Sequence, residues 1–136
     1  DSAEHYEKFL KPALKNKRNI VISDRDWESS IVYQCFVQET IDIYDMARLH
    51  AIVTDFLLPD LLFIIDSETP HGLKHDRLDN IGQDFREQIR KQYRSLLNSM
   101  YLMYPKIYID TTEKNWEQYV KDIIKHIKKY VIKHKK

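Results

Sequence analysis

Three short runs of apolar residues alternate along the chain with longer stretches of amphipathic spacing. The runs are Asn19–Ser23, Leu61–Asp66 and Lys106–Asp110, and a polar stretch follows each of them. Continuous runs of this length, rich in β-branched residues, are typical of strands buried on both faces of a parallel sheet. A hairpin sheet would show alternation and two-residue glycine turns instead. The pattern therefore predicts an α/β fold with parallel strands.

The intervals between these runs carry apolar residues three and four positions apart, as amphipathic helices do. Helices are predicted over Ala3–Lys15, Ser29–Thr40, Ile43–Phe56, Leu78–Tyr101 and Trp116–Ile132. The polar stretch Ser67–Arg77, which contains Gly72, is predicted to be a mobile loop. Because no internal repeat or second boundary interrupts this order, residues 1–136 are expected to form one domain.

Composition narrows the classes of protein without choosing one. Lys and Arg number 22 against 21 Asp and Glu, and a net charge of +1 gives no reason to expect a nucleic-acid partner. The longest apolar runs fall far below the ~20 residues that span a bilayer, so no membrane helix is expected. The only cysteine, Cys35, and the absence of a secretory signal favour a cytoplasmic protein. Cys35 lies on an apolar helix and is interpreted as a core residue rather than a nucleophile.

The most informative polar residues follow the first apolar run. In open parallel sheets, ligands bind in the crevice beyond the carboxyl ends of the strands, and Asp24 and Arg25 come at such an end. Arg25 could fork onto phosphate oxygens, and Asp24 could orient it or hold the water shell of a metal ion. The alternative interpretation of this dipeptide is a plain salt bridge at the end of a strand.

The wider string DRDWESSIVYQ, residues 24–34, resembles the thymidylate kinase motif of Asp-Arg-Tyr, a small polar residue and then Ala-Tyr-Gln. Four other stretches resemble the same family in the same order. They are HYEKFLKPAL before the motif and, after it, PDLLFIID, DRLD and the strand ending in Ile-Asp. The resemblance covers the whole chain. It implies the three-layer parallel sheet, flanked by helices, of the P-loop nucleoside-monophosphate kinases.

The resemblance also implies a role for each matching residue. Arg25 falls where the family grips the monophosphate of the acceptor nucleotide, and Asp24 falls where an acidic partner lies near the reacting phosphates. Ser30 falls near the base edge and Tyr33 near the sugar, where an aromatic ring disfavours a 2′-hydroxyl. Gln34 is adjacent to this group. For Tyr33, simple packing on the sheet is the alternative.

The segment of about 67–77 resembles the lid of the family. Its candidate catalytic cations are Lys74 and Arg77, accompanied by His71 and His75. Phosphoryl transfer needs positioning and charge neutralisation, so a basic lid over ATP would suit that reaction. A solvated loop without a ligand is the alternative. The two histidines lack a third close ligand, so no metal site is predicted here.

As a whole, the resemblance implies transfer of the ATP γ-phosphoryl group to dTMP to give dTDP, with Mg²⁺ bridging the phosphates. The family is commonly a homodimer. However, no G-x-x-x-x-G-K-[ST] loop occurs in these 136 residues, and only two glycines are present. The chain alone is therefore expected to be inactive and to be part of a longer protein. The strand that carries this loop in the family lies between those resembled by Asn19–Ser23 and Leu61–Asp66.

Two substitutions relative to the family motif widen the choice of function. Ser2 stands where the family usually has an arginine that contacts the base, and the loss of such a donor weakens base selection. Asp26 stands in place of the usual tyrosine and adds negative charge near a phosphate site. Two alternatives to a dTMP kinase follow. One is a kinase of another deoxynucleoside monophosphate, and the other is a non-catalytic kinase-like module that binds a nucleotide or a partner protein.

Overall fold

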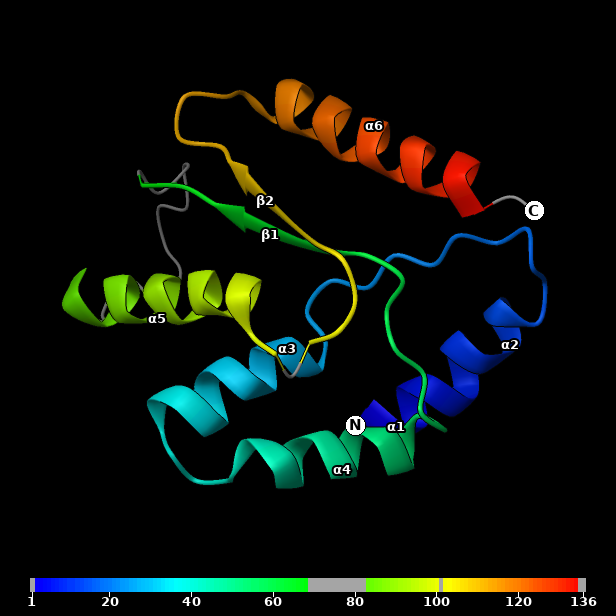
Figure 1. Cartoon of the computed structure of the whole chain (residues 1–136), viewed down its shortest axis with the longest axis horizontal. Coiled ribbons are helices and arrows are strands. Elements are labelled where there is room, and N and C mark those ends of the chain that lie inside the picture. Colours follow the sequence, from blue (N-terminus) through cyan, green and yellow to red (C-terminus); the bar gives the residue numbers. More distant parts are fainter. Residues whose placement is uncertain (1, 69–82, 101, 135–136) are drawn as a thin grey trace. The chain divides into compact units, whose positions relative to one another are not determined.

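The structure is a computed structural model that describes residues 2–68, 83–100 and 102–134 (Figure 1). The chain divides into two compact units, Asp1–Leu58 and Pro59–Lys136. In the residues described, the first unit is helical, and the second combines helices with a small parallel sheet. This mixture is consistent with the predicted α/β class.

The first unit opens with the predicted helix, built from three segments. These are α1 (Ser2–His5), the π-helix η1 (Tyr6–Leu10) and α2 (Lys11–Leu14). Pro12 lies in α2 and has no N–H to donate, and its ring would clash with a carbonyl one turn back in a regular α-helix. The wider π-turn comes immediately before it, with the Lys11 N–H donating to the Tyr6 carbonyl. The π-turn thus changes the helical repeat where proline enters the helix.

Two further helical runs of this unit confirm the next two predicted helices. The first joins α3 (Trp27–Ser30) to the π-helix η2 (Ile31–Val37), and the second is α4 (Ile43–Val53). Aspartates precede both runs, because a carboxylate at the N-cap accepts from the otherwise unpaired first N–H groups. Asp42 accepts from the Tyr44 N–H at 2.8 Å. After α4 the backbone reverses through positive φ angles at Asp55 and Phe56.

The strand predicted over Asn19–Ser23 is not formed in the described part of the chain, and this prediction is wrong. The segment has no ladder partner, and its side chains Ile20 and Ile22 are 62% and 81% exposed. A strand exists only where a neighbour pairs its backbone N–H and C=O groups. The apolar, β-branched composition favours a strand, but the described residues contain no neighbouring segment that pairs with it.

The second unit confirms the other two strands. β1 (Leu62–Asp66) and β2 (Lys106–Asp110) pair in parallel, with Asp66 opposite Asp110 at their carboxyl ends. Helix α5 (Gln83–Ser95), extended by the 3₁₀ turn η4 (Leu96–Asn98), and helix α6 (Trp116–His134) complete the unit. Residues 69–82 lie outside the described part, so the predicted start of α5 at Leu78 stays a prediction.

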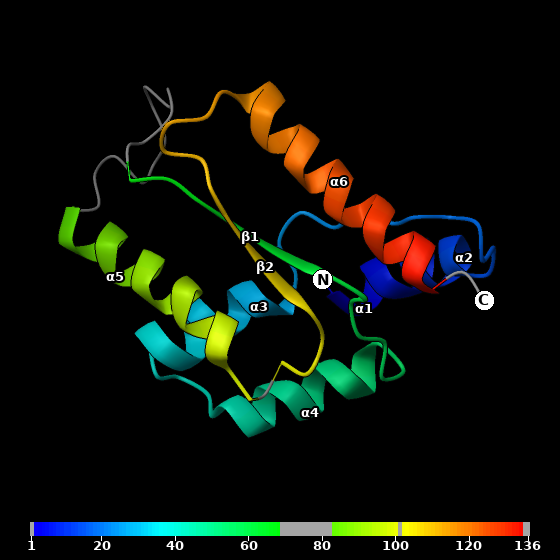
Figure 2. The same cartoon turned by 45° about the horizontal axis from the view of Figure 1, so that its top comes forward.

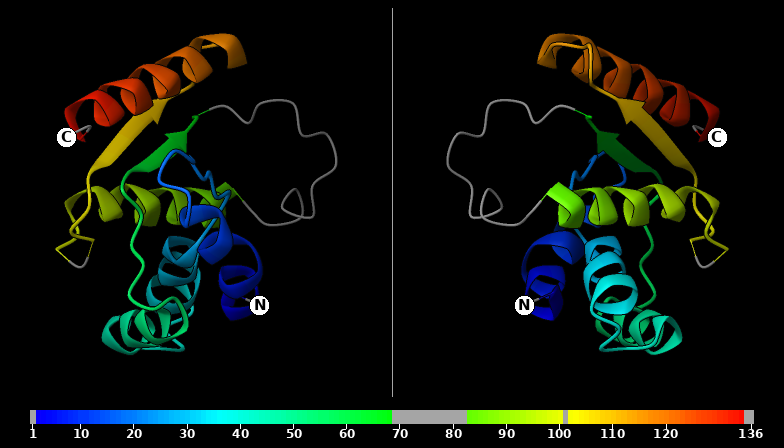
Figure 3. Two further views of the ribbon diagram at one scale, coloured as in Figure 1. Left: turned by 90° about the vertical axis from the view of Figure 1, so that its right-hand side faces the viewer. Right: turned by 90° about the vertical axis from the view of Figure 1, so that its left-hand side faces the viewer.

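Helices α5 and α6 lie on opposite sides of the two strands (Figures 2 and 3). Ile64 and Ile109 of the strands are buried, and so are Leu96 and Leu102. Each strand thus has one buried residue, while Ile65 of β1 and Tyr108 of β2 remain exposed, so the strands are only partly covered in the described residues.

Helix α6 is amphipathic, but its apolar face is only partly covered. Its half-buried apolar side chains include Tyr119, Val120, Ile123, Ile127 and Val131. Trp116 and Ile124, which the spacing assigned to the same face, are exposed.

Candidate functional site

The Asp24–Arg25 pair lies in an exposed turn between the irregular segment Asn19–Ser23 and helix α3. Arg25 has φ = 60°, in the left-handed region that β-carbons disfavour. A non-glycine residue there costs about 1–2 kcal/mol, and such outliers cluster at functional sites. The turn therefore carries strain at the residue that the sequence singles out for phosphate binding.

Asp26 fixes the chain directly after this turn. Its backbone is extended, its side chain accepts from the Trp27 N–H at 2.8 Å, and its carbonyl accepts from the Ser29 N–H at 3.0 Å. The carboxylate that the sequence analysis treated as extra negative charge is thus the N-cap of α3. An N-cap of this kind stabilises a helix by about 1 kcal/mol.

Trp27, the first residue of α3, packs into the interior of the first unit. Its side chain is buried and stacks on the buried His50 of α4, with ring centroids 4.6 Å apart and planes 16° from parallel. Burial lowers the pKa of His50, and the nearby Asp26 carboxylate opposes this shift in part. The imidazole is therefore neutral at pH 7. The Trp27 Nε1 atom is buried and makes no hydrogen bond within the described residues.

The residues predicted to meet the acceptor nucleotide lie on the helical run that follows. Ser30 ends α3, while Tyr33 and Gln34 belong to the π-helix η2. Ser30 and Tyr33 are half-buried and Gln34 is exposed, whereas Ile31 and Val32 are fully buried. The buried pair holds the run in place, and the polar residues beside it remain accessible. π-helical turns are frequent at functional sites.

The lid candidates Lys74 and Arg77, with His71 and His75, lie outside the described residues. Asp24, Arg25, Ser30, Tyr33 and Gln34 lie in one short stretch of the first unit, as their sequence positions require, and their roles and the lid stay predictions.

The second unit contains an ion-pair cluster that the sequence analysis did not predict. The Asp66 carboxylate ends β1, its side chain is 9% exposed, and it accepts from Arg90 Nε at 2.8 Å and from Arg94 Nε at 2.8 Å. Tyr108 of β2 donates its hydroxyl to the same carboxylate at 2.8 Å. Glu87 holds the other side of the Arg90 guanidinium at 2.7 Å. These bonds tie the carboxyl ends of both strands to α5.

Electrostatics in this cluster strongly favour the charged carboxylate. Burial alone would raise the pKa of Asp66, but the hydrogen bonds from Arg90, Tyr108 and Arg94 hold that pKa well below its ordinary value. The pKa values of Arg90 and Arg94 are raised by their hydrogen bonds to Asp66, which is the reciprocal effect. Arg90 and Arg94 of α5, spaced four residues apart, both bond the carboxylate at the end of β1. That spacing was the one signal in the sequence.

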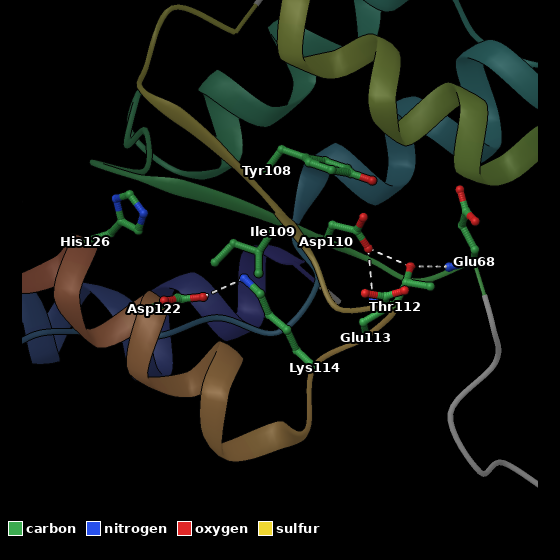
Figure 4. A pocket seen from close by; sticks show the side chains of 9 residues that line it. All are labelled: Glu68, Tyr108, Ile109, Asp110, Thr112, Glu113, Lys114, Asp122 and His126. Carbon is green, nitrogen blue, oxygen red and sulfur yellow. Dashed lines mark hydrogen bonds and ion pairs between the residues drawn. The ribbon is translucent and has the colours of Figure 1, made fainter.

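A hollow of about 590 Å³ opens beside the carboxyl end of β2 (Figure 4). Thr112 links its rim, donating its hydroxyl to Asp110 at 2.6 Å and accepting from the Glu68 N–H at 3.0 Å. Lys114 pairs with Asp122 at 2.8 Å. The lining residues are Glu68, Tyr108, Ile109, Asp110, Thr112, Glu113, Lys114, Asp122 and His126. Its carboxylates outnumber its cations, so it suits an uncharged or cationic group better than a phosphate.

Other candidate chemistry is limited in the residues described. Cys35 is half-buried rather than fully in the core, and burial raises the pKa of its thiol, so the nucleophilic thiolate is scarce at neutral pH. Residues 2–68, 83–100 and 102–134 contain no group of three or more His, Cys, Asp or Glu side chains that could hold a metal ion. None of the described helices combines the length and apolar character that crossing a bilayer requires.

The helices and the small parallel sheet define an α/β protein, and the comparison with known proteins agrees with this class. The family model described as thymidylate kinase matches residues 1–123. The thymidylate kinase of Helicobacter hepaticus is 30% identical over 133 residues, which cover 93% of this chain and 63% of that protein.

Two shorter matches are similar. The thymidylate kinase of Bifidobacterium longum is 32% identical over 101 residues, covering 71% of this chain and 48% of the relative. That of Thermosipho africanus is 34% identical over 100 residues, covering 69% and 49%. The chain thus spans about half to two thirds of the length of the curated relatives that it matches. It belongs to the thymidylate kinase family.

Proposed function

We propose that the protein to which this chain belongs is a nucleoside-monophosphate kinase that transfers the γ-phosphoryl group of ATP to dTMP and releases dTDP. The observation that carries the proposal is the Asp24–Arg25 turn. It presents an exposed arginine in a left-handed conformation at the head of the helical run of Ser30 and Tyr33. Membership of the thymidylate kinase family supports this assignment.

The chemistry proposed for this chain is acceptor positioning. The Arg25 guanidinium would hold two oxygens of the acceptor monophosphate, because its planar fork matches that geometry. This contact orients the remaining phosphate oxygen towards the donor and offsets charge as it develops on the transferred group. Tyr33 would pack against the sugar, and Ser30 would bond to the base edge. Gln34, exposed on the same run, would extend this polar surface.

The donor half of the site would come from elsewhere in the protein. The lid cations Lys74 and Arg77 are its proposed members within this chain, and the phosphate-binding loop motif does not occur in these 136 residues. Mg²⁺ is usually held by substrate phosphates and one or two carboxylates. Asp24, exposed beside Arg25, is the carboxylate of the acceptor site that fits this need.

We also propose that the complete sheet has three layers and contains a further strand. In the described residues β1 pairs through one edge alone, and the apolar segment Asn19–Ser23 has no ladder partner. An added parallel strand between them would pair both and cover Ile20 and Ile22. The whole of residues 1–136, with a lid at about 67–77, would then belong to one kinase domain.

The direct test uses protein expressed from its complete reading frame, supplied with ATP, Mg²⁺ and a panel of deoxynucleoside monophosphates. ADP formation is expected with dTMP as the preferred acceptor, and the 136-residue chain alone should show none. Preference for another monophosphate would favour the alternative of a kinase of another deoxynucleoside monophosphate, as the substitution at Ser2 suggests. If calorimetry detects binding of dTMP but no ADP is formed, the protein is a non-catalytic kinase-like module rather than an enzyme.

A homodimer is the proposed assembly, and α4 offers the surface for it. Large apolar side chains of α4 and its end are exposed rather than buried, namely Tyr44, Leu49, Ile52 and Phe56. Several exposed apolar side chains on one helix are typical of an interface. Ile52→Glu is therefore expected to halve the mass measured by sedimentation equilibrium, whereas Arg48→Glu, a charge change at an exposed α4 position, should leave the dimer intact. A dimeric Ile52→Glu protein would exclude this surface.

A further inference from the structure

The stacked pair Trp27–His50 packs next to the turn that carries Arg25. Trp27 lies within the string of residues 24–34, but neither Trp27 nor His50 is among the residues to which the resemblance gives a role. Trp27 is two residues after Arg25, and both rings of the pair are buried. Their near-parallel contact at 4.6 Å joins α3 to α4, two helices that are separated in the chain by η2 and the loop after it. The stack therefore fixes the first residue of α3 against a second helix.

The Asp24–Arg25 turn ends two residues before this fixed residue, Trp27. Arg25 is in a left-handed conformation that its own side chain disfavours. The next residue, Asp26, is held by two hydrogen bonds, which it accepts from the backbone N–H groups of Trp27 and Ser29. The backbone N–H of Trp27 donates one of these bonds, so the buried indole and the Asp26 cap belong to adjoining residues at the start of α3.

We propose that the Trp27–His50 stack is a positioning pair for Arg25, setting the direction in which the guanidinium meets the acceptor monophosphate. This inference rests on the proposed function of Arg25. Trp27 and His50 act through the backbone of the turn and touch no reacting atom. They set acceptor affinity and leave the ATP site unaffected.

In the part of the chain that the structure describes, the charged groups of α3 and α4 define the electrostatic setting of the stack. Asp26 acts on His50 from the start of α3, and Glu28 is buried on α3 itself. On α4, Asp45 and Arg48 pair with each other at 3.9 Å on exposed positions. A neutral imidazole lies face to face with the indole at pH 7, and protonation below pH 6.5 would place a cation against it. Imidazolium quenches indole fluorescence, so the pair carries its own spectroscopic signal.

The kinetic test compares His50→Ala with His50→Phe, which keeps an aromatic ring at the stack. His50→Ala is expected to raise the KM for dTMP about tenfold, with the KM for ATP unchanged, because an aromatic contact of this kind contributes on that scale. His50→Phe should restore the parent KM. A loss of folded protein alone would lower the apparent kcat and leave KM as it was. Unchanged KM for dTMP in folded His50→Ala protein would overturn the proposal.

The spectroscopic test needs no activity and separates the two proposals. Tryptophan emission should fall as the pH drops below 6.5, and this step should disappear in Trp27→Phe and in His50→Phe but persist in Trp116→Phe. Asp26→Asn keeps an N-cap side chain but removes the charge, and it should move the step to lower pH. A step that survives in Trp27→Phe would show that the stack is not formed. If the step behaves as expected and the parent does not use dTMP, the proposed function fails.

Discussion

Arg25→Ala is expected to lower kcat/KM for the acceptor nucleotide by about 10²- to 10³-fold, the scale on which a single phosphate- or oxyanion-binding donor contributes. The guanidinium is exposed and supplies a bidentate fork that no neighbour in the turn replaces. Arg25→Lys should recover part of this loss, because it keeps the charge without the fork. Steady-state kinetics with ATP and dTMP measure both effects.

Arg25→Gly separates the side chain from the backbone. Glycine accepts φ = 60° without a β-carbon clash, so the free energy of unfolding of Arg25→Gly should exceed that of Arg25→Ala by about 1 kcal/mol. Both variants should lose activity to the same extent. Arg48→Ala, which removes an equal charge from an exposed position of α4, should keep the parent kcat/KM. If Arg25→Ala retained full turnover, the acceptor-site assignment would fail.

Asp66→Ala is expected to destabilise the fold by about 3 kcal/mol, because it leaves two arginines at the end of β1 without their carboxylate. Asp66 is 9% exposed and accepts from three side chains, so its removal breaks the link between both strands and α5. Urea denaturation of the full-length protein measures the change. Tyr108→Phe removes one of these bonds and should cost about 1 kcal/mol.

The pH dependence of this cluster has a definite sign. The folded-state pKa of Asp66 lies below its value in an unfolded chain, so the stabilisation is complete above about pH 4 and is lost as the pH falls further. Asp66→Ala should therefore show a flatter loss of stability on acidification than the parent. Glu87→Gln, at an exposed partner of Arg90, should change stability by less than about 1 kcal/mol. An unaltered unfolding midpoint in Asp66→Ala would contradict the stabilising role of the Asp66 ion-pair cluster.

Local pattern was a good guide wherever neighbouring residues decide the structure. Helical spacing placed the runs around Tyr6, Ile31 and Met46, and continuous apolar character placed β1 and β2 in parallel. Asn19–Ser23 has the same character as these strands and forms none, because pairing depends on another segment of chain. Exposed apolar residues on α4 and α6 show the same limit, since period alone does not say what covers a face.

The candidate site divides in the same way. The Asp24–Arg25 motif and the helical run from Ser30 to Gln34 are contiguous in sequence, so their spacing was enough to identify them. The Asp66 cluster joins residues 24 and 28 positions apart, and a salt bridge at such a distance leaves almost no local trace. Likewise, the sequence indicates only that Asp26 adds a charge near the predicted phosphate site. Its hydrogen bond from the Trp27 N–H shows that it also caps helix α3.

The sequence by itself determined the family, the helical segments, two parallel strands and the residues offered to an acceptor nucleotide, since these follow from short-range spacing and an ordered motif series. Tertiary structure alone decided the left-handed turn at Arg25, the stack of Trp27 on His50 and the convergence of Arg90, Arg94 and Tyr108 on Asp66. These depend on burial and on contacts between distant elements, because backbone strain and a shifted pKa arise only when folding places the compensating groups together.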